Sequence, residues 1–133
     1  MAISYRTNYQ VTVSAVAKLF ISSGIRRPAD DLDRIRQLLN NANLTVTAWD
    51  GEWLAGIGRA LTDYSFCCYL SDLAVDTDYQ HQGIGKEIIK HIDNTLGDEV
   101  MLLLLLAAPE AMDYYPHIGF DAANNAWIIP RGE

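Results

Sequence analysis

The sequence predicts an α+β fold with a mixed, mostly antiparallel sheet and helices on both faces. Three observations predict it. Two amphipathic helical patterns come first, three strand patterns joined by tight turns follow, and a further helical pattern separates the third strand from an almost continuous apolar run. Such a strand–helix–strand unit pairs its two strands in parallel through a right-handed connection. A chain of 133 residues fits one domain, which we expect to span residues 1–133.

The chain is expected to begin with a short strand over residues 3–6, followed by two helices. Apolar residues recur at helical spacing over residues 13–21, with Thr12 as the expected N-cap and Gly24 as the end of the helix. The second helix opens near Pro28, because proline fits the first helical turn and acidic residues follow it there. Its apolar face is expected to consist of Leu32, Ile35, Leu38 and Leu39.

An antiparallel meander of three strands is expected next, over residues 44–49, 53–61 and 65–75. The first turn contains Asp50-Gly51, a dipeptide that favours a tight hairpin because glycine adopts a positive φ without strain. Gly56 and Gly58 lie within the second strand, where glycine indicates a bulge or a close backbone approach.

The second half of the chain continues with a charged loop over residues 76–85 and an amphipathic helix over residues 86–96. The run over residues 100–106 is almost entirely apolar, as expected of a strand that is covered on both faces. The remaining expected elements are a short helix over residues 109–115 and one or two last strands from Phe120 and residues 127–129.

The charge balance argues against a nucleic-acid-binding protein. The chain has 10 Lys and Arg against 17 Asp and Glu, a net charge of −7, whereas a protein that binds a phosphate backbone needs a basic face. The acidic excess suits a small or cationic partner, or simply maintains solubility.

The sequence predicts no membrane-spanning helix, no signal peptide and no metal site. The apolar run over residues 100–108 is less than half as long as a membrane-spanning helix, and residues 1–10 lack the apolar core of a signal peptide. Cys67 and Cys68 are neighbours on a predicted strand and point to opposite faces, so they are poorly placed to form a disulfide. We therefore expect a reducing cytoplasm. The histidines and cysteines lack metal-ligand spacing.

Gly83 and Gly85 lie where the charged loop becomes a helix. Glycine lets a ligand approach the main chain, and the unpaired N–H groups of a helix start favour a phosphate. A plain turn and helix cap would use the same residues. The pattern lacks the third glycine of a dinucleotide fingerprint and the Gly-Lys-Ser/Thr of a Walker loop, which excludes both of these sites.

Two segments together resemble a known family. The arrangement Val75-x-x-x-x-Gln80-x-x-Gly83-x-Gly85 resembles the coenzyme A-binding motif of the GNAT-type N-acetyltransferases. Residues 111–120, AMDYYPHIGF, resemble the Ala-x-x-Phe-Tyr-x-x-x-Gly-Phe segment of the same family. The order of the expected elements is similar to this fold as well. The resemblance covers nearly the whole chain and implies a GNAT-like acyl-CoA N-acyltransferase fold.

The resemblance implies acetyl-CoA as the cosubstrate and assigns residues to it. A bulge would splay the strand over residues 65–75 from the strand over residues 100–106, and the pantetheine arm would lie in that wedge. Tyr115 would be the general acid; a phenol, with a pKa near ~10, can protonate the departing thiolate, and its other interpretation is aromatic packing beside Phe120. The expected cofactor-binding residues are Leu73, Ala74 and Val75 for the pantetheine and Gln80, His81, Gln82, Gly83, Ile84, Gly85 and Lys86 for the pyrophosphate.

Two positions depart from the family. Some members have a glutamate base where this chain has Leu103, and many have an asparagine where it has Ala108. Asp72 is the expected substitute for the base, either directly or through a water, although a solvated or turn-capping carboxylate is an equal interpretation. Glu110 and Asp113 are weaker candidates, and Tyr114 is expected to pack.

The sequence therefore predicts an enzyme, an N-acetyltransferase that transfers the acetyl group from acetyl-CoA to the amine of a small cationic acceptor. Transfer would occur by direct attack in a ternary complex, with the acceptor pocket lined by residues 25–31 and the strand hairpins. A protein N-terminus or lysine is the alternative acceptor, and a non-catalytic acyl-CoA-binding module is the alternative function. The resemblance is also compatible with a homodimer.

Overall fold

A five-stranded sheet runs through the computed structural model, which describes residues 2–132. The strands lie in the order β1-β2-β3-β4-β5; the first four are antiparallel to their neighbours, and β4 and β5 are parallel. This is the mixed, mostly antiparallel sheet that the sequence predicts. The strands are β1 Ser4–Thr7, β2 Leu44–Asp50, β3 Trp53–Thr62, β4 Cys67–Val75 and β5 Leu102–Leu104.

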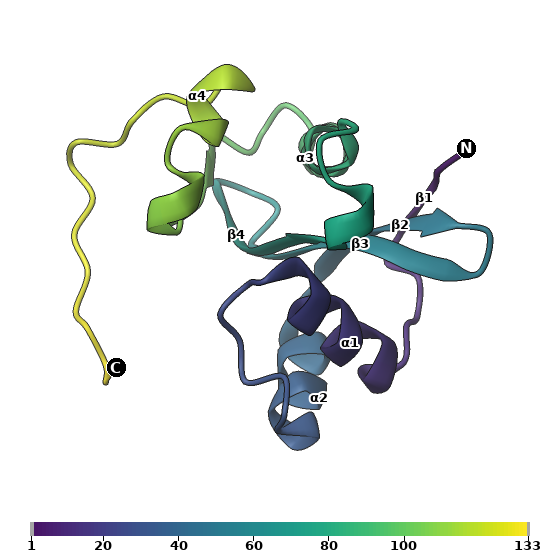
Figure 1. Ribbon diagram of the computed structural model, residues 1–133. Helices are drawn as coiled ribbons and strands as arrows, with labels where there is room; N and C mark the ends of the chain where they lie inside the picture. Colours follow the sequence, from purple (N-terminus) through teal and green to yellow (C-terminus); the bar gives the residue numbers. More distant parts are fainter. Residues whose placement is uncertain (1, 133) are drawn as a thin grey trace.

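Helices cover both faces of this sheet (Figure 1). On one face lie α1, Val13–Ser23, and α2, Leu32–Asn41; on the other lies α3, Ile84–Leu96, with the short α4, Tyr114–His117, beside it. The described residues also form two 3₁₀ turns, η1 Thr77–Tyr79 and η2 Pro109–Ala111. Each face has its own apolar core, one around α3 and one around α1 and α2.

Local signals in the sequence set the ends of α1. The Thr12 side chain accepts a hydrogen bond from the backbone N–H of Ala15 over 3.1 Å, which satisfies one free donor of the first turn. At the other end Gly24 adopts a φ of 82°, a left-handed conformation that costs glycine little. Both ends agree with the sequence prediction.

The glycines of β3 bring α3 close to the sheet. A Cβ atom on Gly58 would lie 2.6 Å from Cγ2 of Ile88 and 3.0 Å from Cδ1 of Ile92, so only glycine leaves room for the helix there. The pairing of β2 with β3 also shifts between Ala48 and Trp49, which leaves Ala55 of β3 as a bulge. Of the two alternatives expected at these glycines, the structure shows the close approach, and the bulge lies beside them at Ala55.

The C-terminal prediction is wrong. Residues 118–132 form no strand, and Trp127 and Ile129 are 94% and 88% exposed. The segment runs away from the sheet (Figure 1). A strand forms only where another strand offers its edge, and an apolar pattern alone does not supply that partner. For the same reason the strand expected over residues 100–106 is limited to Leu102–Leu104, the part that pairs with β4.

Candidate active site

A β-bulge opens a wedge between β4 and β5. Asp72 pairs with Arg59 and Leu70 with Ala60, so Ser71 is the extra residue in β4. The parallel pairing with β5 ends at Tyr69 and Leu104. Beyond that point β4 has no strand partner on this side among residues 2–132. In the segment Leu73, Ala74 and Val75, main-chain groups that point away from β3 are therefore open to a ligand, apart from the Val75 carbonyl, which accepts from Gln80.

A cavity of about 790 Å³ begins in this wedge. It extends from the loop between α1 and α2 to the start of α3, and α4 and the segment after β5 close its other side. The sequence-predicted residues that line it are Leu73, Ala74, Val75, Gln80, His81, Gly83, Ile84, Gly85, Lys86 and Tyr115. Gln82 and Asp72 are the two predicted site residues that are not part of its lining.

The N-terminus of α3 forms one end of the cavity. The first helical hydrogen bond joins the N–H of Glu87 to the carbonyl of Gly83 over 3.0 Å, so the N–H groups of Ile84, Gly85 and Lys86 have no partner within the helix. Gly83 has a φ of 82° and supplies no side-chain cap. These free donors, together with the helix dipole, can accommodate a pyrophosphate.

The loop before α3 is fixed to β4 by the side chain of Gln80. Its Nε2 donates to the carbonyl of Val75 over 2.9 Å. At the start of the helix, a Cβ on Gly85 would lie 2.9 Å from the hydroxyl of Tyr114, so Tyr114 packs directly against the proposed pyrophosphate site. Packing was the role expected of Tyr114 from its sequence, but nothing in the sequence indicated that it would pack at Gly85.

Tyr115 enters the cavity from α4. Its ring lies edge-on to Phe120, with 5.4 Å between the ring centroids, and to Tyr114, with 5.2 Å. Burial raises the pKa of Tyr115, and the neighbouring Tyr114 raises it further. The phenol therefore keeps its proton at neutral pH. The aromatic packing and the cavity position occur together, so the packing does not exclude a role as proton donor.

The comparisons with known proteins agree with this geometry. A family model described as an acetyltransferase (GNAT) domain matches residues 12–127. This chain belongs to the GNAT acetyltransferase family. Its similarity to a Gracilaria tenuistipitata var. liui protein, an uncharacterized N-acetyltransferase ycf52, is 29% identity over 119 residues. That match covers 85% of this chain, and the chain spans only 64% of that relative's length.

Solved structures of GNAT proteins share the fold. A Streptococcus pneumoniae TIGR4 GNAT-family acetyltransferase has a TM-score of 0.73 and 22% identity, covering 98% of this chain and 100% of that one. An aminoglycoside acetyltransferase from an uncultured soil metagenomic sample, in complex with sisomicin, has a TM-score of 0.70 and 20% identity, covering 98% of this chain and 96% of that one.

The environment of Asp72 in this GNAT domain matches neither interpretation from the sequence. Its side chain is fully buried, with 0% exposure, and does not line the cavity. Nε of Arg27 donates to Oδ1 over 2.5 Å, and Nε of Arg59 donates to Oδ2. Both carboxylate oxygens are therefore bound to guanidinium groups, which compensates the cost of burying the charge. Asp72 is neither a solvated carboxylate nor a base that faces the acceptor.

Sequence reasoning missed the arginines of this cluster. Arg59 lies in the middle of an otherwise apolar strand, and its side chain is only 6% exposed. A lone cation at such a position needs a buried anion, and this was the available signal. Arg27 gave no such signal because it lies in a loop. Of residues 25–31, which were expected to line the acceptor pocket, Ile25, Arg26 and Arg27 line the cavity.

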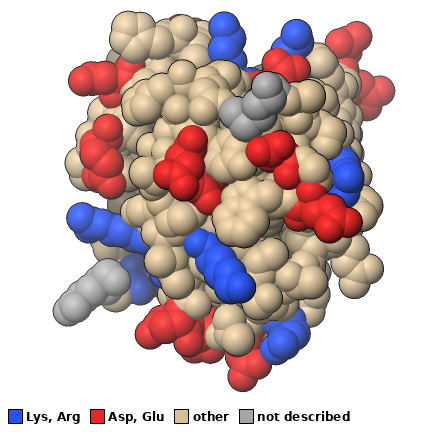
Figure 2. All heavy atoms as spheres, turned by 45° about the vertical axis from the view of Figure 1, so that its right-hand side comes forward, with Lys and Arg blue, Asp and Glu red and all other residues tan. Residues whose placement is uncertain are grey.

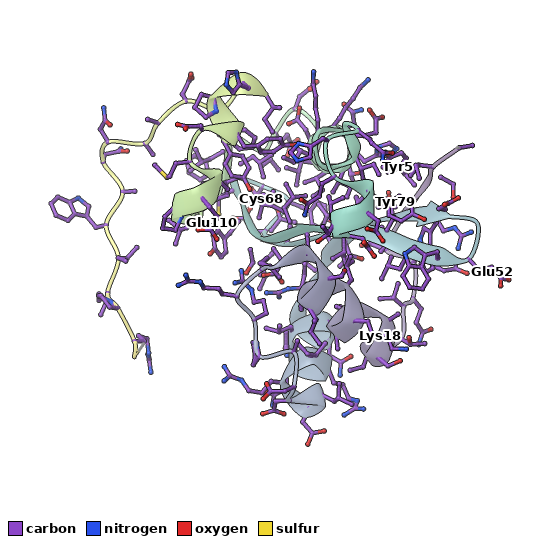
Figure 3. The ribbon with its side chains drawn as sticks, viewed as in Figure 1. Tyr5, Lys18, Glu52, Cys68, Tyr79 and Glu110 are labelled. Carbon is purple, nitrogen blue, oxygen red and sulfur yellow. The ribbon has the colours of Figure 1, made fainter. Side chains whose placement is uncertain are left out.

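The two departures from the family pattern lie in the region after β4. Leu103 is a partly buried residue of β5, whereas Ala108 lines the cavity directly before η2. Glu110 of η2 also lines the cavity and projects on the side of the molecule where β4 lies (Figure 3).

Within residues 2–132 no group of three or more His, Cys, Asp or Glu is placed to hold a metal ion. Over the same range, none of the helices has the length and apolar character needed to cross a membrane.

Proposed function

We propose that this GNAT domain transfers an acetyl group from acetyl-CoA to the amine of a small cationic acceptor. One observation carries the proposal: the splayed strands, the free helix start and Tyr115 surround a single cavity of about 790 Å³. That volume is within the range of small-molecule sites. Transfer occurs by direct attack of the amine while both substrates are bound.

The chain offers contacts for both parts of coenzyme A. In the segment Leu73, Ala74 and Val75, the main-chain groups that point away from β3 bind the pantetheine arm, because no strand pairs with them on that side. The segment from Gln80 to Lys86, including His81 and Gln82, binds the pyrophosphate through its backbone donors. The cosubstrate supplies an acyl thioester, which is already activated for attack by an amine.

Proton movements balance the reaction. The amine nitrogen forms a bond to the acyl carbon, the carbon–sulfur bond breaks, and the electron pair leaves on sulfur. After the C–N bond forms, the nitrogen still carries one proton too many and releases it to solvent as the tetrahedral adduct collapses. Tyr115 donates its proton to the departing thiolate and recovers one from solvent. A backbone N–H near the Ser71 bulge stabilises the oxyanion that forms on the carbonyl oxygen.

The proton of the acceptor ammonium must also be removed. Asp72 has both oxygens bound to arginines, and Asp113 does not line the cavity. Glu110 lines it, is exposed to solvent and is free to accept this proton directly or through a water. We therefore assign the base to Glu110 in place of Asp72.

The proposal also includes the compartment, the class of partner, the oligomeric state and the domain organisation expected from the sequence. Both cysteines carry free thiols, which supports a reducing cytoplasm. On the face shown in Figure 2, acidic and basic side chains are interspersed, which supports a small-molecule partner over a nucleic acid. The exposed apolar residues Trp127 and Ile129 support a homodimer. The single five-stranded sheet supports one domain over residues 1–133.

The test is a panel of amines incubated with acetyl-CoA, with the release of free thiol as the readout. The panel contains amino acids, polyamines, arylalkylamines and an aminoglycoside, together with peptides that present an N-terminus or a lysine. Thiol release with a small amine supports the proposal. Release only with peptides favours a protein acceptor, and acetyl-CoA binding without any turnover favours the non-catalytic acyl-CoA-binding module.

A further inference from the structure

Basic residues dominate the acceptor end of the cavity. Arg26 and Arg27 are consecutive in the loop between α1 and α2, and both line the cavity. Glu110, from the opposite wall, is the acidic residue in the lining that the described chain contributes. An acceptor is therefore met by two cationic groups and one anionic group.

Asp72 leaves a net positive charge on this side. Its carboxylate is the anion that Arg27 binds, but the same carboxylate also binds Arg59. Two guanidinium groups and one carboxylate leave one positive charge on the cluster. The carboxylate has 0% exposure and the Arg27 side chain 28%, so the residue of the cluster that lines the cavity is the cationic one.

Arg27 also fixes the position of Arg26. Its Nη1 donates to the backbone carbonyl of Arg26 over 2.6 Å, and its Nη2 donates to the carbonyl of Ser71 in the β4 bulge over 2.7 Å. The backbone of Arg26 is thereby attached to the strand where the acyl group would lie. Arg26 is an exposed residue that lines the cavity, and within residues 2–132 no carboxylate lies within ion-pair distance of its guanidinium. Its planar donor set is available to a ligand.

We infer that the acceptor carries a carboxylate beside its amine, and that Arg26 binds this carboxylate. The inference rests on the proposed acetyl transfer and narrows its acceptor to an amino-acid-like zwitterion. Arginine binds a carboxylate through two parallel charge-assisted hydrogen bonds, which fix the orientation of the ligand. Glu110 then faces the ammonium end, so that both charges of the zwitterion meet their opposites. A polyamine would place a second positive charge near Arg26 and would be repelled.

The experiment compares three forms of the same acceptor: an amino acid, its carboxamide and the decarboxylated amine. Free-thiol release gives kcat/KM for each, and calorimetry gives the affinity of each for the protein saturated with coenzyme A. We expect kcat/KM and affinity to be at least about tenfold higher for the acid, the range of charge-assisted hydrogen bonds. In Arg26→Gln this ratio falls toward one. The control variant Arg36→Gln, on the exposed face of α2, keeps the wild-type ratio.

Each outcome separates the inference from the function on which it rests. Equal or better use of the carboxamide and the decarboxylated amine overturns the inference and leaves acetyl transfer intact. An acid preference that persists in Arg26→Gln overturns the role of Arg26. If no amine releases thiol, the proposed function fails, and the calorimetric comparison still decides whether the site selects a carboxylate.

Discussion

Arg27 donates from Nε to Oδ1 of Asp72 over 2.5 Å, and this ion pair attaches the loop between α1 and α2 to β4 across 45 residues of sequence. Arg59 of β3 binds the other oxygen of the same carboxylate. One buried charge cluster thus holds three elements together beside the wedge. The loop between α1 and α2, which lines the cavity, is positioned here by electrostatics as well as by packing.

Replacing Asp72 by asparagine should destabilise the fold. Asp72→Asn keeps the shape of the side chain but leaves two guanidinium groups, one of them buried, without their counter-charge. Breaking a buried pair of this kind costs about 3–5 kcal/mol in the free energy of unfolding, which urea denaturation measures. The exposed pair of Arg36 and Asp33 provides the control, because Asp33→Asn should cost less than about 1 kcal/mol. Equal stabilities for the two variants would show that the cluster does not hold the site.

Removing the hydroxyl of Tyr115 should slow turnover without displacing acetyl-CoA. Phenylalanine keeps the edge-on contacts with Tyr114 and Phe120, so the wall of the cavity is preserved. We expect kcat for Tyr115→Phe to fall about ten- to a thousandfold, with little change in the affinity for acetyl-CoA. Tyr114→Phe is the matched control, with a smaller effect on kcat. A wild-type kcat in Tyr115→Phe would leave the ring as packing alone.

The raised pKa of Tyr115 sets the alkaline side of the pH profile. The acid form of the phenol is the active one, and it is lost only as the pH rises through its pKa, which burial moves above 10. Turnover should therefore rise as the acceptor amine loses its proton and should show no descending limb below about pH 10. Measurement of kcat from pH 6 to pH 10 checks this. A descending limb between pH 7 and pH 9 that disappears in Tyr115→Phe would contradict the assignment.

A side chain at Gly83 should weaken the binding of the cosubstrate. Gly83→Val places a β-branched residue at a φ of 82° where α3 begins, a conformation that such residues avoid. The strain displaces the first amides of the helix, and loss of one or two charge-assisted hydrogen bonds weakens acetyl-CoA binding at least about tenfold.

Gly51→Val is the control for this effect. Gly51 also has a positive φ, 60°, but it lies in the β2–β3 turn and does not line the cavity. Calorimetric titration should show wild-type affinity for acetyl-CoA in Gly51→Val. Equal loss in both variants would mean that the affinity follows general stability rather than the α3 start.

Elements with local signals were predictable from the sequence. The N-cap at Thr12 and the left-handed Gly24 depend on a few neighbouring residues. The two glycines before α3 placed its start at residue 86, two residues after the observed start at Ile84. The sequence placed the start of β4 at residue 65, whereas the strand starts at Cys67. Oδ1 of Asp63 accepts hydrogen bonds from the N–H groups of Ser65, Phe66 and Cys67, which holds Ser65 and Phe66 in the turn. The three backbone hydrogen bonds stabilise the carboxylate form and lower the pKa of Asp63 to about 2.

Long-range contacts could not be predicted in the same way. Asp72 was recognised as a carboxylate near the wedge, but its partners lie 45 and 13 residues away and depend on the folded sheet. The apolar pattern of residues 127–129 suits a strand, yet in the structure no neighbouring strand pairs with it. In both cases the outcome depends on a partner that a local pattern does not specify.

The most direct test is a calorimetric titration of the wild-type protein with acetyl-CoA. If main-chain donors of β4 and α3 hold the pantetheine and the pyrophosphate, one molecule binds per chain with a saturable heat, and free coenzyme A competes with it. The absence of any binding heat at millimolar acetyl-CoA would contradict this account of the cavity.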